Sequence, residues 1–424
     1  MVRRLKRSTL LFSRQFWDSL GPGLITGAAD DDPSGVATYS VAGAQLGTNL
    51  LWTALITWPL MAGVQMMCAR IGMVSGRGLS AAFKSKFPRP VLIVAITALL
   101  AANTINVGAD LAGMADAAEL LTHLSSHIWV PIFAVVISIA TVRLRYYQIA
   151  KSLKWLALVL FAYVISAFVI HPDWKAALHD TFIPSMPRGK EGWETLVAIL
   201  GTTISPYLFF WQATQEVEEE KASGRNTLKA RKGATQTEIL TRKFDVGMGT
   251  FFSNLVMYFI ILTTAFTLNR HGLKNVETSK DAANALLPLA GRLATTLYTV
   301  GIVGVGLLAI PTLTGSAAYA FAEAFGWRQG LDKRLNQARS FYAMILLSTV
   351  AAVAMDFSKI SPVKALYWTA VINGVLAPFL LVGILIVACD EKLCCGQTSS
   401  WLGRFAVGIT ALAMFVAAIA MFLV

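Results

Sequence analysis

The stretch that decides the fold is GPGLITGAADDDPSGVATYS at residues 21–40. It is apolar enough to enter a membrane, yet three consecutive aspartates at 30–32 stand in its middle. Acidic residues at membrane depth are costly and mark functional sites. Because Pro33 lacks a backbone N–H and Gly35 lacks a side chain, we expect the helix to stop and restart here. Asp32 is then expected to be the N-cap of the second half-helix.

Two interpretations of these aspartates stand side by side. Asp32 is either a buried anionic ligand or a helix cap and nothing more, a role that Ser or Asn fills without a buried charge. Of the other two, we expect one to face an aqueous vestibule and attract cations, and Asp31 is the candidate for such a pathway role. Unwound backbone at this depth is tolerated only where it lines a cavity or is packed by protein.

The composition of the whole chain is that of a membrane protein. Of its 424 residues 55% are hydrophobic and only 14% are charged, and the mean hydropathy is +0.59. A soluble domain carries about 25% charged residues. These values exclude a soluble enzyme, a disordered scaffold and a disulfide-rich secreted protein, and they indicate one all-α polytopic membrane body.

Hydropathy predicts eleven membrane spans after a basic cytoplasmic tail at 1–19. The spans are 20–42, 49–74, 90–115, 128–144, 153–171, 195–215, 245–268, 293–322, 340–356, 361–389 and 403–423. With a cytoplasmic N-terminus, 27 of the 36 basic residues fall on the inside, as the positive-inside rule requires. The formal charge of +12 therefore indicates an anionic cytoplasmic leaflet rather than a nucleic acid. We expect a multi-pass protein of the inner membrane with its C-terminus outside, and no protein partner.

A second interruption lies in the sixth span, LVAILGTTISPYLFFWQATQEVEE at 196–219. Pro206 interrupts the helix, and Thr202 and Ser205 supply hydroxyl and freed carbonyl oxygens. Alone, this pattern is also typical of a kink satisfied by hydroxyls. However, Pro33 and Pro206 interrupt corresponding spans of two five-span halves, and such pairs indicate a transporter binding site between inverted repeats.

One face of the third span carries another acid. Asn103, Asn106 and Asp110 are spaced by three and four residues, so they share one helix face. That face lines a polar path or serves helix packing, and the sequence leaves both open. No Lys or Arg stands in the middle of any span, which indicates that a cation is the missing partner of the buried acids.

Together these motifs resemble the Nramp family of divalent-metal transporters. G-P-G at 21–23 followed by D-P-S-G at 32–35 resembles the family's first-helix signature, which usually ends D-P-G-N. S-P-Y at 205–207 stands where the family has M-P-H. Weaker likenesses are D-L-A at 110–112, T-L-T-G at 312–315 and N-G-V-L-A-P-F at 373–379.

The resemblance implies a LeuT-type fold of two inverted five-helix repeats plus an eleventh helix. The repeats would run from about 20 to 171 and from about 195 to 389, and the extra helix from about 403 to 423. All of them would form a single transport domain over 20–424. The resemblance also implies a transported metal ion, no enzyme activity and no cofactor.

Carried over residue by residue, the resemblance implies a set of metal-site residues. It also shows where this sequence departs from the family's pattern. Asp32 keeps the metal-binding aspartate, whereas the asparagine ligand three residues on is Gly35 here. The metal-binding methionine is replaced by Ser205, and the position whose backbone carbonyl binds metal is Thr202. The histidine linked to proton movement is replaced by Tyr207.

Two further positions complete the expected pathway. Asp110 is kept, although Gly113 stands where the family usually has a second acid, and Asn373 would approach the site from the tenth helix. An all-oxygen ligand set suits hard ions, and Mg²⁺ is commonly bound through few protein ligands because it dehydrates reluctantly. The chain therefore looks like the Nramp-related magnesium transporter branch.

The resulting prediction is a secondary transporter that takes up divalent cations by alternating access, Mg²⁺ first and Mn²⁺ as a second substrate. The alternatives are a proton-coupled Mn²⁺/Fe²⁺ carrier of the ordinary Nramp type and a LeuT-type carrier of organic solutes. An intramembrane aspartyl protease using Asp32 and Asp110 is the competing enzyme reading, supported only by V-G-A-D at 107–110.

Overall fold

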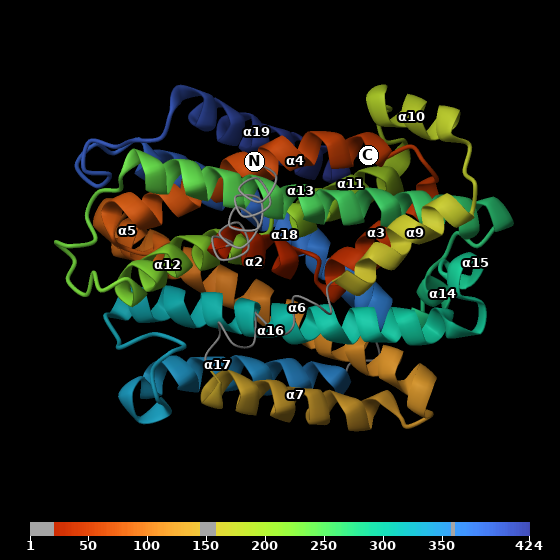
Figure 1. Ribbon diagram of the computed structural model, residues 1–424, viewed down its shortest axis with the longest axis horizontal. Coiled ribbons are helices and arrows are strands. Elements are labelled where there is room, and N and C mark those ends of the chain that lie inside the picture. Colours follow the sequence, from red (N-terminus) through yellow and green to blue (C-terminus); the bar gives the residue numbers. More distant parts are fainter. Residues whose placement is uncertain (1–20, 145–157, 358–360) are drawn as a thin grey trace, which may run out of the picture.

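The computed structural model describes residues 21–144, 158–357 and 361–424. The predicted basic tail at 1–19 and the first residues of the span predicted at 153–171 lie outside the described residues. Within the described part the regular structure is helical, without a strand. The long helices run side by side along the longest axis of the molecule (Figure 1).

Eight helical segments of the described part are long and apolar enough to cross a membrane. Six of them are single helices: α4 (Leu51–Ser75), α6 (Arg89–Thr122), α7 (Ser126–Arg143), α16 (Ala294–Phe325), α18 (Pro362–Ala388) and α19 (Trp401–Leu423). The other two are Gln236–His271, which joins α13 (Gln236–Thr267) to η2 (Asn269–His271), and the interrupted segment Gly189–Ala222. The ninth predicted span is the shorter apolar helix α17 (Arg339–Ala354). The described part of the fifth span is η1 (Leu158–Leu160) and α9 (Phe161–Val169).

Both predicted interruptions are present. The first span is divided into α2 (Pro22–Asp30) and α3 (Pro33–Leu46), and the sixth into α11 (Gly189–Thr203) and α12 (Pro206–Ala222). In each case a proline occupies the first helical position of the second half, where its missing N–H is not needed.

Some helices extend beyond the predicted spans. α6 has 34 residues, and α13 begins at Gln236 rather than near 245 because a capping box of Thr235 and Glu238 starts it in the polar stretch. Hydropathy finds only the part of a helix that lies in the hydrocarbon, so polar ends are missed. Short helices occupy the connections: α5 (Leu79–Lys86), α10 (Trp174–Phe182), α14 (Ser279–Asn284) and α15 (Leu287–Ala290).

The connections predicted to be cytoplasmic contact one another at one end of the molecule. Lys86 pairs with Asp390 at 2.7 Å, and Arg231 Nε donates to the Gly76 carbonyl at 3.3 Å. Connections predicted to be outside also contact one another: the Thr48 hydroxyl donates to the Asp180 carboxylate. These contacts agree with the predicted alternation of spans.

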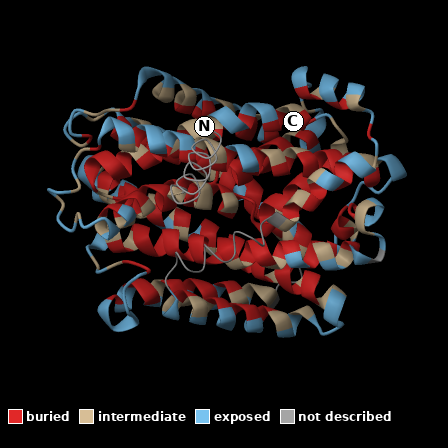
Figure 2. Ribbon diagram, viewed as in Figure 1, coloured by how far each residue is buried: buried red, intermediate tan, exposed pale blue. Residues whose placement is uncertain are grey.

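Buried residues fill the centre of the bundle, and exposed ones lie at its two ends and along its outer helices (Figure 2). Large apolar side chains stand exposed on the outer helices α7 and α19, including Val135, Leu412 and Phe422. Such exposure is expected of surfaces that face lipid. In the interior, a Cβ added to Gly201 of α11 would lie 2.0 Å from the Ala370 carbonyl oxygen. Helices α11 and α18 therefore approach each other closely next to the second interruption.

Candidate functional site

The first interruption places three carboxylates inside the protein. α2 ends at Asp30 and α3 begins at Pro33, with Asp32 as its N-cap. Asp32 Oδ1 accepts a hydrogen bond from the Gly35 backbone N–H at 2.7 Å, as predicted for a cap. Asp30, Asp31 and Asp32 are 0%, 6% and 2% exposed, and none of them pairs with a Lys or Arg of the described part.

Asp30 and Asp31 contact α13 rather than open water. Ser253 Oγ lies 2.6 Å from Asp30 Oδ2 and 3.1 Å from Asp31 Oδ1. The expectation that one of these carboxylates faces an open vestibule is wrong for this conformation, because α13 packs against α2 and α3 and covers both. Nothing in the sequence marked Ser253 as their partner.

Helix α6 connects Asp32 to a fourth carboxylate. Asn106 Nδ2 lies 3.2 Å from Asp32 Oδ2 and 3.2 Å from Asp110 Oδ2, so one amide group links the two acids. Asn103 Nδ2 donates to the Leu313 carbonyl at 2.9 Å. The three polar side chains do share one face, which contacts the interruption at Asp110 and Asn106 and packs on α16 at Asn103. The packing role is therefore confirmed for Asn103, whereas a polar path along Asn106 and Asp110 stays a prediction.

At the second interruption the Ser205 hydroxyl forms hydrogen bonds with carbonyl groups of the preceding helix, α11. Ser205 Oγ donates to the carbonyl oxygens of Gly201 at 2.7 Å and Thr202 at 2.8 Å. Pro206 has no N–H, so the Thr202 carbonyl would otherwise lack its helical donor. In this conformation Ser205 therefore satisfies the interrupted backbone with its hydroxyl hydrogen, while its oxygen lone pairs stay free and its role as a ligand stays a prediction. The Thr202 Oγ1 atom is buried and has no hydrogen-bond partner in the described part.

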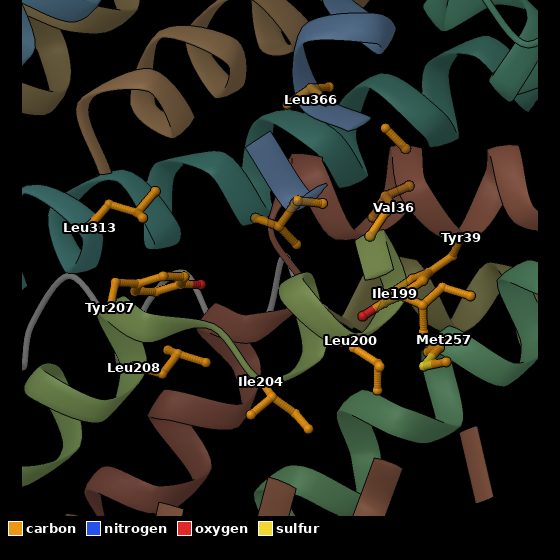
Figure 3. Close-up of a cluster of buried hydrophobic side chains, with 14 of the residues drawn as sticks. Val36, Tyr39, Ile199, Leu200, Ile204, Tyr207, Leu208, Met257, Leu313 and Leu366 are labelled. Carbon is orange, nitrogen blue, oxygen red and sulfur yellow. The ribbon is translucent and has the colours of Figure 1, made fainter. Parts of the chain in front are cut away.

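Tyr207 connects the two interrupted helices by a hydrogen bond. Its hydroxyl donates to the Ala29 carbonyl of α2 at 2.8 Å. The normal helical donor to that carbonyl would be the N–H of residue 33, which is proline, so the tyrosine supplies the missing hydrogen bond. Tyr207 lies in the cluster of buried side chains around the second interruption, near Leu208 and Leu313 (Figure 3).

The remaining predicted residues differ in how they relate to the site. A Cβ added to Gly35 would lie 3.3 Å from Thr202 Oγ1 and 3.4 Å from the Asp30 carbonyl oxygen, so Gly35 stands between the two interruptions. Asn373 of α18 is buried but forms no hydrogen bond with the residues of either interruption in the described part. The structure thus brings together every predicted site residue except Asn373.

Several buried oxygens at the site accept no hydrogen bond in the described part of the chain. They are Asp30 Oδ1, Asn106 Oδ1, Asp110 Oδ1 and Thr202 Oγ1. A buried acceptor without a donor costs about 1–3 kcal/mol, and a cation offsets that cost at several acceptors at once. Within the described residues no group of three or more His, Cys, Asp and Glu side chains could hold a metal ion. The arrangement therefore suits a cation held by mixed carboxylate, amide, hydroxyl and carbonyl oxygens.

A charged cluster that the sequence did not reveal fixes the start of α2. Asp245 of α13 accepts hydrogen bonds from the backbone N–H groups of Gly21, Gly23 and Leu24 at 3.0, 2.8 and 3.2 Å. Its carboxylate is in turn bound by Arg242 at 2.6 Å, which also pairs with two glutamates of α12, Glu216 and Glu219. The cap that Gly21 cannot provide thus comes from another helix.

Known proteins are similar to this chain in sequence and in architecture. Residues 23–424 match the family described as natural resistance-associated macrophage protein-like, Nramp. A divalent metal cation transporter MntH of Caldanaerobacter subterraneus subsp. tengcongensis is 26% identical over 388 residues, which cover 89% of this chain and 86% of the relative. A relative of the same name from Yersinia pestis is 28% identical over 309 residues, 70% of each protein.

Solved structures show the same fold. The manganese transporter of Eremococcus coleocola, in complex with an aromatic bis-isothiourea compound, aligns with a TM-score of 0.74 at 17% identity, covering 96% of this chain and 88% of that one. The nucleobase-cation-symport-1 transporter Mhp1 in a closed conformation aligns with a TM-score of 0.58 at 14% identity, covering 95% and 91%. The expected LeuT-type fold is confirmed, and the relatives are named as transporters, not enzymes. The chain belongs to the Nramp family.

Proposed function

We propose that this protein transports divalent metal cations across the membrane through the site between its two interrupted helices. The observation that carries the proposal is the Asp32 carboxylate, buried at the α2–α3 interruption, linked through Asn106 to Asp110 and without a basic partner in the described part. A buried, uncompensated carboxylate is costly, and a substrate cation supplies the missing charge. Metal ions are cargo in this account, and no cofactor is required.

Manganese is the first ion to test. The family relatives are named divalent metal cation transporters, and the Eremococcus coleocola structure is of a manganese transporter. Neither name supports the predicted Mg²⁺ preference, so the alternative of an Nramp carrier for transition-metal ions is the better supported one. The interruptions at Asp32 and Ser205 are the elements whose movement would expose the ion to each side in turn.

Magnesium remains a second candidate because of one observation, the replacement of the family's methionine ligand by a residue without sulfur. The position of the family's methionine is Ser205, and that of its asparagine is Gly35, which offers only backbone. Oxygen donors alone discriminate weakly against hard ions. We therefore expect Mg²⁺ in excess to compete with Mn²⁺, whereas a site that contains a thioether would resist that competition.

The organic-solute and protease alternatives fit the geometry less well. An aspartyl dyad needs two carboxylates in direct contact that share one proton, but here the Asn106 amide lies between Asp32 and Asp110. An organic substrate does not supply the charge that the buried acids lack. Uptake of a solute without any divalent ion would favour that alternative.

The proposed placement is a multi-pass protein of the inner membrane with a cytoplasmic N-terminus. It rests on the positive-inside bias and on the contacts among the basic connections at one end of the bundle, for example Lys86 with Asp390. This end would face the anionic lipids of the cytoplasmic leaflet. The single transport domain over 20–424, with repeats at about 20–171 and 195–389, belongs to the same proposal.

Uptake into proteoliposomes tests the proposed function. Purified protein should accumulate Mn²⁺ above the level of empty liposomes, and a pH-sensitive dye inside the vesicles reports whether protons enter with the metal. Because Tyr207 stands in place of the family's histidine and its hydroxyl is bound to the Ala29 carbonyl, we expect metal entry with little acidification. Protein-free levels of both Mn²⁺ and Mg²⁺ uptake would contradict the proposal.

A further inference from the structure

A hollow of about 460 Å³ lies at one end of the molecule, away from the interrupted helices. It is bounded by the α4–α5 connection, α5, the last turns of α12, the chain that follows α12, and the end of α16. Four basic side chains line it, together with one acid; we call it the basic pocket, and these five residues are Arg77, Lys84, Lys221, Arg231 and Glu323.

The positive charge of the basic pocket is largely uncompensated. Only Lys221 pairs with a carboxylate, that of Glu218 at 2.7 Å. Lys84 Nζ donates to the Ala324 carbonyl at the end of α16 at 2.7 Å. Arg231 donates to three backbone carbonyls, and the Arg77 guanidinium forms no hydrogen bond or ion pair in the described part. Arg77 and Lys84 thus face the hollow without an anionic partner in the described part, whereas Arg231 also interacts electrostatically with the Glu220 carboxylate.

The one acid of the pocket is already used by the protein. Glu323 Oε2 accepts a hydrogen bond from the Ala81 backbone N–H at 3.0 Å, and Oε1 accepts one from Gln329 at 3.4 Å. It thereby caps the start of α5, whose N-cap residue Gly78 has no side chain. Its charge offsets at most one of the four positive charges.

We propose that the basic pocket binds a phosphate-bearing anion. The Arg77 guanidinium has its donors free and can match the oxygens of a phosphate with a pair of parallel hydrogen bonds, while Arg231 has its Nη2 donors left to contribute. The half-buried positions of both arginines keep these bonds less exposed to water than surface pairs. A free phosphate compound and a phospholipid headgroup present the same group, and the ligand is defined by that shared chemistry.

The ligand would bridge the end of α12 and the α4–α5 connection, which bears on transport if the protein is the transporter proposed above. Lys221 belongs to α12, the second half of an interrupted helix, while Arg77 and Lys84 belong to the α4–α5 region packed on α16. An anion bound to both sides would hold the end of α12 in place and slow transport. Only this consequence rests on the proposed function; the binding itself does not.

Isothermal titration of the full-length protein in neutral detergent with inorganic pyrophosphate, without divalent metal, tests the binding. Arg77→Gln is the informative variant because that side chain contacts no other group that its loss would disturb. We expect at least about tenfold weaker binding in Arg77→Gln, the value of one charge-assisted hydrogen bond. Lys333→Gln, an exposed charge outside the pocket, is the control and should bind within about twofold of the parent protein.

Two results would overturn the proposal: equal binding by Arg77→Gln and the parent protein, or no binding to the parent protein at concentrations on the order of 1 mM. Nanodiscs distinguish the source of the phosphate. If phosphatidylglycerol nanodiscs weaken pyrophosphate binding relative to phosphatidylcholine nanodiscs, the occupant is an anionic headgroup; if they do not, it is a soluble phosphate compound. Because no metal is present, a failure of the metal-transport proposal leaves this test intact.

Discussion

Replacement of Tyr207 by phenylalanine removes one oxygen atom and tests how the two interrupted helices are joined. The Tyr207 hydroxyl donates to the Ala29 carbonyl at 2.8 Å, and Pro33 provides that carbonyl with no alternative N–H. Both groups are buried, so the substitution leaves an acceptor without a donor. Such a loss costs about 1–3 kcal/mol.

Tyr39→Phe is the matched control. Tyr39 is also fully buried near the second interruption (Figure 3), and its hydroxyl interacts with the Thr202 hydroxyl rather than with a backbone carbonyl. Removing it leaves no backbone acceptor without a donor, so Tyr39→Phe should cost less than Tyr207→Phe. Thermal unfolding of the two variants in the same detergent, followed by intrinsic fluorescence, should show the larger fall in Tm for Tyr207→Phe.

The same hydrogen bond is expected to favour the conformation described here over one in which α2 moves away from α12. A loss of 1–3 kcal/mol corresponds to a shift of about 5–150-fold in the balance between two conformations. Thiol labelling of a cysteine introduced at Ala29 should therefore be faster in the Tyr207→Phe background. The reasoning is refuted if the Tm values of Tyr207→Phe and Tyr39→Phe agree and the labelling rate is unchanged.

Three further changes test other parts of the structure. Gly201→Ala places a Cβ 2.0 Å from a backbone oxygen of α18 and should lower the Tm by far more than Gly408→Ala, whose Cβ meets nothing within 4 Å; equal effects would contradict the close packing. Asp245→Ala removes the cap of α2 and one anionic partner of a buried arginine, a loss of about 3 kcal/mol or more, and hydrogen exchange at residues 21–24 should accelerate; unchanged exchange would count against this role. Asn106→Leu removes the buried amide oxygen that is a candidate ligand, so Mn²⁺ should raise its Tm less than that of the parent protein; an equal rise would show that this amide takes no part in binding the cation.

The features that the sequence predicted well are those with a local cause. A proline interrupts a helix wherever it stands, so both interruptions and the Asp32 cap were predictable from a few residues each. The shared face of Asn106 and Asp110 followed from helix geometry alone. Charge asymmetry between loops is also additive along the chain, which is why the span count agrees with the contacts at the two ends.

The features that could not be predicted from the sequence depend on contacts between residues that lie far apart in the chain. Ser253 meets Asp30 across 223 positions of sequence, and Tyr207 meets Ala29 across 178. Of the two roles weighed for Ser205, the kink satisfied by a hydroxyl is present, since its hydroxyl donates to two carbonyls of its own helix, and its role as an ion ligand stays a prediction. Which of several nearby acceptors a hydroxyl binds depends on how the helices pack around it.

Transport by Asp32→Ser tests the central claim most directly. Serine is as good an N-cap as aspartate, so this variant keeps the start of α3 and removes the buried charge together with the oxygen that accepts from Asn106. If Asp32 binds the transported ion, proteoliposomes with Asp32→Ser should take up Mn²⁺ at the rate of empty liposomes, while Asp332→Ser, an exposed aspartate, should match the parent protein. Parent-level Mn²⁺ uptake by a folded Asp32→Ser protein would show that Asp32 is a helix cap and nothing more.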